Sequence, residues 1–123
     1  MRQAGLLAAA GLYCLKHISK HLQADHQNTK RLADRLATLK GSGISLVLES
    51  VESNIIYFTV AHKTHNAPSL VKALGCPSLV NGHKVVVKAG AKSPTLIRVV
   101  VHHQVSQNDV DCVIERVKKL LTS

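Results

Sequence analysis

The pattern of apolar and polar positions along the chain begins with a helix that is apolar on several faces. Residues 2–15, RQAGLLAAAGLYCL, are rich in Ala and Leu, a composition that favours helix formation. Ala4, Ala8 and Gly11 follow one another at spacings of four and three and form a smooth face that would admit a second backbone. A helix of this kind needs cover on several sides, and we do not expect the rest of so short a chain to supply it.

A second helix is expected to follow, after a bend, as far as Leu39. Apolar residues recur there at the spacing of one helical face, with Asp25 as the polar exception, and charged residues occupy the other faces. The stripe consists of Ile18, Leu22, Thr29, Leu32, Leu36 and Leu39. Gly41 and Gly43 are expected to end this amphipathic surface helix.

The period then changes to the alternation that is typical of strands. In residues 44–49, Ile44, Leu46 and Leu48 alternate with Ser45, Val47 and Glu49, as in a strand. Residues 54–60, NIIYFTV, are rich in β-branched and aromatic side chains. Two later segments, KVVVK at 84–88 and TLIRVVV at 95–101, have the same character. The sequence therefore predicts four strands.

Capping signals predict two more helices. Asn66 is a good N-cap for a short helix with Pro68 in its first turn, and Gly75 is expected to end that helix. Ser106 precedes Asp109 by three residues, a pattern that resembles a capping box and predicts a C-terminal helix. The apolar face of this last helix consists of Val110, Val113, Ile114, Val117, Leu120 and Leu121.

The order of these elements is helix, helix, β, β, helix, β, β, helix. It predicts an α+β fold in which a three- to four-stranded, mainly antiparallel sheet carries helices on one face, preceded by a long N-terminal linking helix. We expect residues 1–40 to hold the linking and amphipathic helices and residues 41–123 to form the α+β small domain. Together they make one domain-sized unit, as the length of 123 residues allows.

The net charge of +9 raises the question of nucleic acid as a partner. The basic residues are scattered, however, and no run of them is longer than two. The aromatic side chains are Tyr13, Tyr57 and Phe58, too few for a surface that stacks on bases. A solvated surface is the favoured interpretation, and neither nucleic acid nor a membrane is expected as a partner.

Cysteine usage bears on the compartment. The chain has an odd number of cysteines, far apart and without a C-x-x-C pair, at positions Cys14, Cys76 and Cys112. This pattern is typical of free, mostly buried thiols in a reducing compartment and predicts a cytoplasmic protein. The apolar segment at the N-terminus has no convincing cleavage site and is too short to cross a bilayer.

Arg98 is the most informative candidate for chemistry. It lies inside TLIRVVV on the same side as Leu96 and Val100, and a guanidinium cannot lose its charge there, so it needs an acceptor. No acidic residue lies in the same strand. Two interpretations stay open: Arg98 binds an anion from outside the chain, such as a ligand carboxylate, or it is an edge-strand arginine that reaches water.

Other polar residues give weaker signals. Arg2 precedes a helix and could contribute to a phosphate site, although an ordinary solvated side chain is the favoured interpretation. His17 and His21 are four residues apart and could share a metal, but no third ligand is evident and surface histidines are favoured. His102 and His103 end the last strand, where solvent-exposed side chains are favoured over a catalytic role. Taken alone, the residues do not encode a complete active site.

Four segments in a fixed order carry a resemblance to a known family. They are MRQAGLLAAAGLY at 1–13, LQADH at 22–26, SNIIYF at 53–58 and RVVVHHQVS at 98–106. Together they resemble the C-terminal third of L-threonine aldolases, a family of pyridoxal-phosphate (PLP) lyases with the aspartate-aminotransferase fold, also called fold type I. The resemblance covers nearly the whole chain and is loosest over residues 61–94.

The resemblance implies roles for two arginines. Arg98 would bind the α-carboxylate of the substrate, and Arg2 would help to hold the phosphate of PLP, across a subunit interface. The reaction would be retro-aldol cleavage of L-threonine or L-allo-threonine to glycine and acetaldehyde, with the cofactor accepting the electron pair. The Schiff-base lysine of the family stands in a Ser-Lys-Gly context, and the closest string here, SKH at 19–21, does not match it. No catalytic residue and no metal ligand is therefore assigned to this chain.

The resemblance also implies partners. The first helix would link this small domain to a large PLP domain and be covered by that domain and a neighbouring subunit of a homo-oligomer, which is a tetramer in the family. The expected ligand is an amino-acid substrate, and we expect the chain to be a fragment or truncated product that is inactive alone. The alternatives are a degenerate, non-catalytic module that assembles with a full-length relative and, less favoured, a basic RNA-binding α+β domain.

Overall fold

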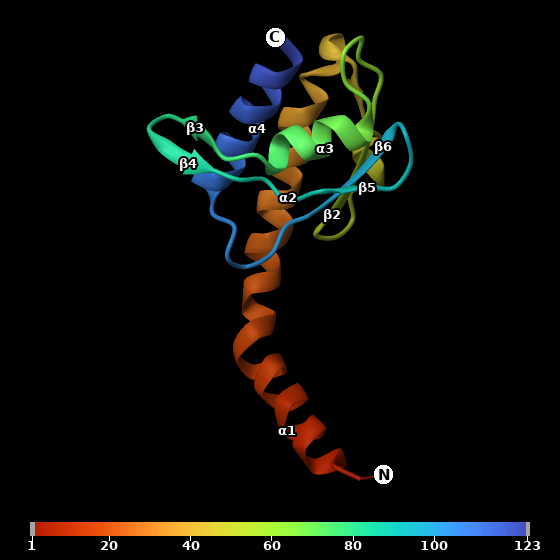
Figure 1. Ribbon diagram of the computed structural model, residues 1–123. Helices are drawn as coiled ribbons and strands as arrows, with labels where there is room; N and C mark the ends of the chain where they lie inside the picture. The colour runs from red at the N-terminus through yellow and green to blue at the C-terminus, as the bar shows by residue number, and fades with distance from the viewer. Residues whose placement is uncertain (1, 123) are drawn as a thin grey trace.

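The computed structural model describes residues 2–122 and has the α+β architecture that the sequence predicts (Figure 1). In chain order the helices and strands are α1 (Ala4–Tyr13), α2 (Leu22–Ala37), β1 (Ile44–Ser45), β2 (Ile55–Val60), α3 (Ala67–Gly75), β3 (Ser78–Val80), β4 (His83–Val85), β5 (Gly90–Ala91), β6 (Leu96–Val100) and α4 (Gln107–Thr122).

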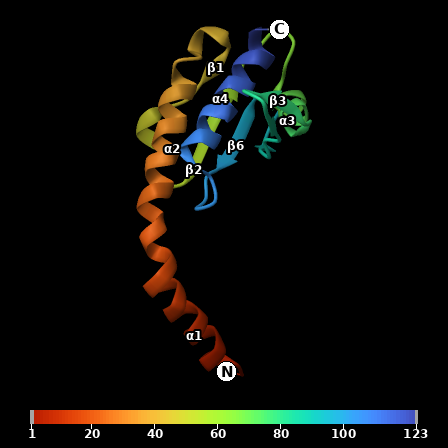
Figure 2. The same ribbon diagram turned by 90° about the vertical axis from the view of Figure 1, so that its left-hand side faces the viewer.

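Helix α1 extends away from the body of the molecule like a stalk (Figures 1 and 2). The expected bend lies between α1 and α2, where a π-helical turn at Cys14–Ile18 and a 3₁₀ turn at Ser19–His21 replace regular α-helix. Every residue from 2 to 20 is exposed, which confirms that this chain does not cover its own first helix. The large apolar side chains left in solvent there are Leu6, Leu7, Leu12, Tyr13, Leu15 and Ile18.

The main sheet has four antiparallel strands in the order β1-β2-β6-β5. Helices α2, α3 and α4 contribute to a single core on one face of this sheet, as Figure 2 shows for α2 and α4. The largest fully buried side chains include Leu36, Ile44, Ile56, Leu70, Leu74, Ile97 and Ile114. Because all three helices lie on the same side, the opposite face of the sheet has no helix over it within residues 2–122.

The predicted apolar stripe of α2 is only partly buried. Its C-terminal half packs into the core through Leu32 and Leu36, whereas Ile18 and Leu22 are exposed because they precede the point where the helix meets the domain. The regular helix ends at Ala37, two residues before the predicted end.

Both predicted capping signals are confirmed. The side chain of Asn66 accepts the backbone N–H of Ser69, whose hydroxyl in turn accepts the N–H of Asn66. At the start of α4, Asp109 Oδ2 accepts both the backbone N–H and the hydroxyl of Ser106, at 2.8 and 2.7 Å. The hydroxyl bond, followed by the backbone bond, lowers the pKa of Asp109 below its ordinary value of 3.8.

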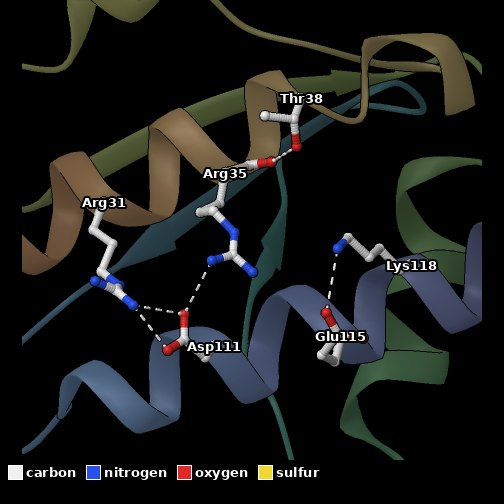
Figure 3. A network of polar contacts seen from close by, with 6 residues as sticks. All are labelled: Arg31, Arg35, Thr38, Asp111, Glu115 and Lys118. Carbon is white, nitrogen blue, oxygen red and sulfur yellow. Dashed lines mark hydrogen bonds and ion pairs between the residues drawn. The ribbon is translucent and has the colours of Figure 1, made fainter.

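Helices α2 and α4 are joined across the surface by one carboxylate that serves two arginines (Figure 3). Asp111 on α4 lies 2.9 Å from Arg31 Nη2 and 3.5 Å from Arg35 Nη1, both on α2. A second pair, Lys118 with Glu115, stays within α4 at 3.2 Å. The two helices are therefore held both by apolar packing and by an exposed ion-pair network.

Two strand predictions need correction. The segment 44–49 forms a strand only at Ile44–Ser45, because a 3₁₀ turn follows at Leu48–Ser50. The segment 84–88 does not extend the main sheet: its first residues belong to β4, which pairs with β3 in a separate hairpin. The turn of that hairpin is Asn81-Gly82, with φ of 51° and 81°. Such left-handed pairs are typical of two-residue hairpins, so the Asn-Gly signal was present in the sequence.

Candidate functional site

Arg98 lies in the middle of β6 and faces away from the core. Its neighbours along the strand, Ile97 and Val99, belong to the core or pack against it, and alternation along a strand turns Arg98 to the opposite face. The side chain is half-buried among its neighbours, yet its nitrogens are not sealed from solvent. The structure thus places a permanent positive charge on the uncovered face of the sheet.

Tyr57 on β2 is the direct cross-strand neighbour of Arg98. The N–H of Val60 donates to the carbonyl of Thr95, so Val60 and Thr95 form a hydrogen-bonded pair. Hydrogen-bonded and non-hydrogen-bonded pairs alternate along an antiparallel ladder, and Tyr57 and Arg98, three positions further on, are therefore a non-hydrogen-bonded pair. Side chains approach most closely at such pairs. Tyr57, which is 48% exposed, is therefore the cross-strand neighbour of Arg98 on the open face.

Gly90 on β5 faces Arg98 from the other side. A Cβ built at Gly90 would meet one atom within 4 Å, the carbonyl oxygen of Arg98 at 3.9 Å. Gly90 thus contributes no side chain beside Arg98, and no side-chain atom of the described residues lies within 4 Å of the position where its Cβ would stand. The arginine lies between a large aromatic side chain and a position that carries none.

Arg98 differs from other arginines of the domain in its partners. Arg31 and Arg35 share Asp111, and Arg116 donates to the carbonyl of Ala73 at 3.1 Å. For Arg98, the residues from 2 to 122 provide neither a hydrogen-bond acceptor nor an acidic partner. The expectation that Arg98 has no acid in its own chain is confirmed over that range, and an anion from outside would meet an unneutralised cation.

Arg2 lies just before α1 and is exposed. Within the described range, none of the hydrogen bonds or ion pairs involves its guanidinium. The structure does not bring Arg2 and Arg98 together, since α1 projects away from the sheet that carries Arg98 (Figures 1 and 2). A binding site that uses both arginines therefore needs protein outside residues 2–122 to complete it.

Several histidines form ring contacts with one another or with Tyr13. His21 and His103 lie 5.9 Å apart between ring centroids, His102 and His103 lie 6.2 Å apart, and His17 packs on Tyr13 at 4.5 Å. Across residues 2–122 no group of three or more metal-ligating side chains comes together. His102 and His103 are exposed, as expected for a strand end.

A cavity of about 470 Å³ lies on the core side, between segment 84–88, segment 99–102 and the start of α4. Its lining is largely valine, and Arg98 is not part of it. The cavity therefore does not belong to the arginine site. Of the helices in the described range, none is both long and apolar enough to span a membrane.

Fold and site together define a small α+β domain that presents one unneutralised arginine on an open sheet face. Residues 1–62 match the model of the beta-eliminating lyase family, which in general depends on PLP. Over 123 residues the chain is 31% identical to a probable low-specificity L-threonine aldolase 2 of Arabidopsis thaliana, covering 100% of this chain and 32% of that protein.

Two further relatives have the same description. The chain is 35% identical over 111 residues to low-specificity L-threonine aldolase 1 of Arabidopsis thaliana and 31% identical over 110 residues to the low specificity L-threonine aldolase of Escherichia coli O157:H7. Each match covers 89% of this chain and 28% of the relative. The chain thus belongs to the threonine aldolase family of lyases, and it spans about a third of the length of the curated relatives it matches.

The described residues do not by themselves enclose PLP. Arg2 stands on an exposed stalk, Lys20 lies on an exposed 3₁₀ turn, and the open face around Arg98 has no opposing wall. The cations suit an anionic cofactor and an anionic substrate, but no cradle surrounds them in this part of the protein. We therefore derive no chemical step through PLP from this chain.

Sequence reasoning missed the two neighbours that shape the Arg98 site. In the sequence, Tyr57 stands out only as an aromatic residue of a strand, and no local pattern marks Gly90. Their importance depends on which strands pair and in what register, and no single-residue motif encodes this. The signal that could have found them is the alternation within 95–101 combined with antiparallel pairing to 54–60.

Proposed function

We propose that this chain forms the small domain of a PLP-dependent threonine aldolase-type lyase and that Arg98 binds the α-carboxylate of the amino-acid substrate. The substrates are L-threonine and L-allo-threonine, and the products are glycine and acetaldehyde. The observation that carries the proposal is the half-buried cation of Arg98, without an acidic partner among residues 2–122, on the face that the core helices leave open. Membership of the threonine aldolase family supports the choice of an amino acid as the anion.

The role of Arg98 follows from the shape of its side chain. A planar guanidinium can donate two parallel hydrogen bonds to a carboxylate, which fixes the direction of the carboxylate as well as its position. Holding the carboxylate orients the bond between Cα and Cβ that the reaction breaks, and correct orientation supplies much of the rate gain in such sites. When bound, PLP supplies the electron sink for this cleavage.

Helix α1 and Arg2 have a structural part in the same proposal. The exposed apolar side chains of α1 suit contact with the large PLP domain and a neighbouring subunit of a homo-oligomer, because exposed apolar surface of this kind marks an interface. Arg2, at the start of α1, would reach the phosphate of PLP across that interface. Free thiols at Cys14, Cys76 and Cys112 fit a cytoplasmic setting. The expectation that these thiols are mostly buried is wrong, because Cys14 and Cys76 are exposed and only Cys112 is buried.

The chain alone is proposed to be inactive. Lys20, in the string closest to the family's Schiff-base motif, lies on an exposed 3₁₀ turn. Arg98 then has a carboxylate to bind but no reacting group beside it.

Two assays test this proposal. The purified chain, with PLP and L-threonine, is expected to release no acetaldehyde above a protein-free blank. Residues 1–123 are then substituted for the matching third of the Arabidopsis thaliana threonine aldolase 2 relative, and this chimera is expected to bind PLP and release acetaldehyde. A chimera that binds PLP and still leaves threonine intact would contradict the proposal and favour the non-catalytic module.

A further inference from the structure

We infer that Gly90 determines which side of Arg98 a substrate carboxylate can approach, and that Tyr57 closes the other side. The inference deepens the proposed function and rests on it. It makes Gly90 a specificity-determining position by virtue of the side chain it lacks. The supporting observations are the registers of β2, β6 and β5 and the free space measured at Gly90.

The three residues lie in one row across the sheet. Tyr57 pairs with Arg98, and Arg98 pairs with Gly90, so all three positions face the same side. The guanidinium therefore has an aromatic neighbour toward β2 and an open lane toward β5. A ligand that reaches the guanidinium over the open face therefore has room to extend over Gly90 but not over Tyr57, whose side chain occupies that position.

The space over β5 exists because residue 90 has no side chain. The backbone conformation at this position does not require glycine. Gly90 does not adopt a positive φ, and the position where its Cβ would stand has only ordinary van der Waals contact with the Arg98 carbonyl oxygen. A larger residue can therefore be placed at 90 without backbone strain, in contrast to Gly43 or Gly82. This makes Gly90 a clean probe: its substitution fills the lane and leaves the strand conformation allowed.

The test follows the Nε–H resonance of Arg98 in the full 123-residue chain by NMR while L-threonine, acetate or the bulkier 2,2-dimethylpropanoate is added. In the unsubstituted chain all three are expected to shift the resonance. Gly90→Leu is expected to weaken these shifts at least tenfold. Gly90→Ala is expected to weaken the binding of 2,2-dimethylpropanoate more than the binding of acetate. A merely structural effect of the substitution would not depend on the size of the ligand in this way. Gly75→Leu, at an exposed helix end with nothing within 4 Å, is the matched control and is expected to bind normally.

The outcomes separate the inference from the proposal beneath it. If the carboxylates shift the Arg98 resonance in Gly90→Leu as they do in the unsubstituted chain, the inference is overturned and the proposed function stands. Absence of any shift of Arg98 in the unsubstituted chain overturns both. If Gly90→Leu does not fold, the comparison of the two carboxylates in Gly90→Ala tests the inference. Equal weakening of acetate binding and 2,2-dimethylpropanoate binding in that variant overturns it.

Discussion

The backbone of Gly43 lies directly against the backbone of Ala61, and the N–H of Ala61 donates a 2.7 Å hydrogen bond to the carbonyl of Gly43. Gly43 has a φ of 83°, and a Cβ at this position would collide with the carbonyl oxygen of Ala61. The contact connects the turn after α2 to the end of β2 and so sets where β1 enters the sheet. Two separate reasons, conformation and space, therefore require glycine at this position.

Gly43→Ala is expected to destabilise the domain by about 1–3 kcal/mol, since both the backbone conformation and the contact are penalised. Urea unfolding monitored by circular dichroism measures the change. Gly41→Ala is the control, because Gly41 has no atom within 4 Å and no positive φ. Equal stability of the two variants would show that the close contact at Gly43 is not rigid.

The ion-pair network of Asp111 gives a second prediction. Asp111→Asn is expected to cost about 0.5–1 kcal/mol at low salt, because the carboxylate serves Arg31 and Arg35 but the three side chains are 38–43% exposed and the ion pairs are screened by solvent. The difference between the variant and the unsubstituted chain is expected to shrink in 0.5 M salt, which screens exposed charges. Glu115→Gln, which removes the pair within α4, is the comparison. A loss that does not respond to salt would indicate packing and not charge.

The capping box of α4 gives a pH-dependent prediction. The pKa of Asp109 is lowered in the folded state by the hydroxyl and backbone N–H of Ser106, so its carboxylate stabilises the fold above the unfolded pKa near 3.8. That contribution is lost as the pH falls through the lower folded-state pKa. Ser106→Ala is expected to cost about 1 kcal/mol at pH 7. The stability difference between Asp109→Asn and the unsubstituted chain is expected to narrow below pH 4, measured by urea unfolding at pH 7 and pH 3.

Substitutions in the exposed α1 and in the π-helical turn after it are expected to change self-association without changing stability. Leu7→Glu and Leu15→Glu are each expected to change the free energy of unfolding by no more than about 0.5 kcal/mol relative to the unsubstituted chain, because both side chains are exposed. The same changes are expected to reduce self-association, measured by sedimentation velocity. Leu36→Ala, in the core, is the contrasting variant and is expected to cost about 2–5 kcal/mol. Strong destabilisation by Leu7→Glu would mean that α1 packs on its own domain.

The features predictable from sequence were those fixed by neighbouring residues. The caps at Asn66 and Ser106 depend on residues three positions apart, and the amphipathic face of α4 depends on its own spacing, so local pattern was sufficient. The exposure of residues 2–15 was predictable as well, because a helix apolar on several faces exceeds what a short chain can cover.

The features that escaped prediction depend on tertiary pairing. The valines of segment 84–88 have high strand propensity, yet that segment leaves the main sheet because β4 pairs with β3 through the Asn81-Gly82 turn. Ile18 and Leu22 fit the apolar stripe of α2 and are still exposed, since burial depends on where the helix meets the domain. For the site, Arg98 was identifiable as a charge without a partner, whereas Gly90 and Tyr57 gain meaning only from the register.

The most direct test of the account is the dependence of threonine cleavage on Arg98 in the chimera described above. Arg98→Lys is expected to raise KM for L-threonine at least tenfold, because a lysine keeps the charge but loses the two-pronged hydrogen bonding. Arg31→Lys, at an exposed ion pair, is the matched control and is expected to leave KM within twofold. If Arg98→Lys cleaves threonine with the KM and kcat of the unsubstituted chimera, Arg98 does not bind the substrate carboxylate and the central claim is wrong.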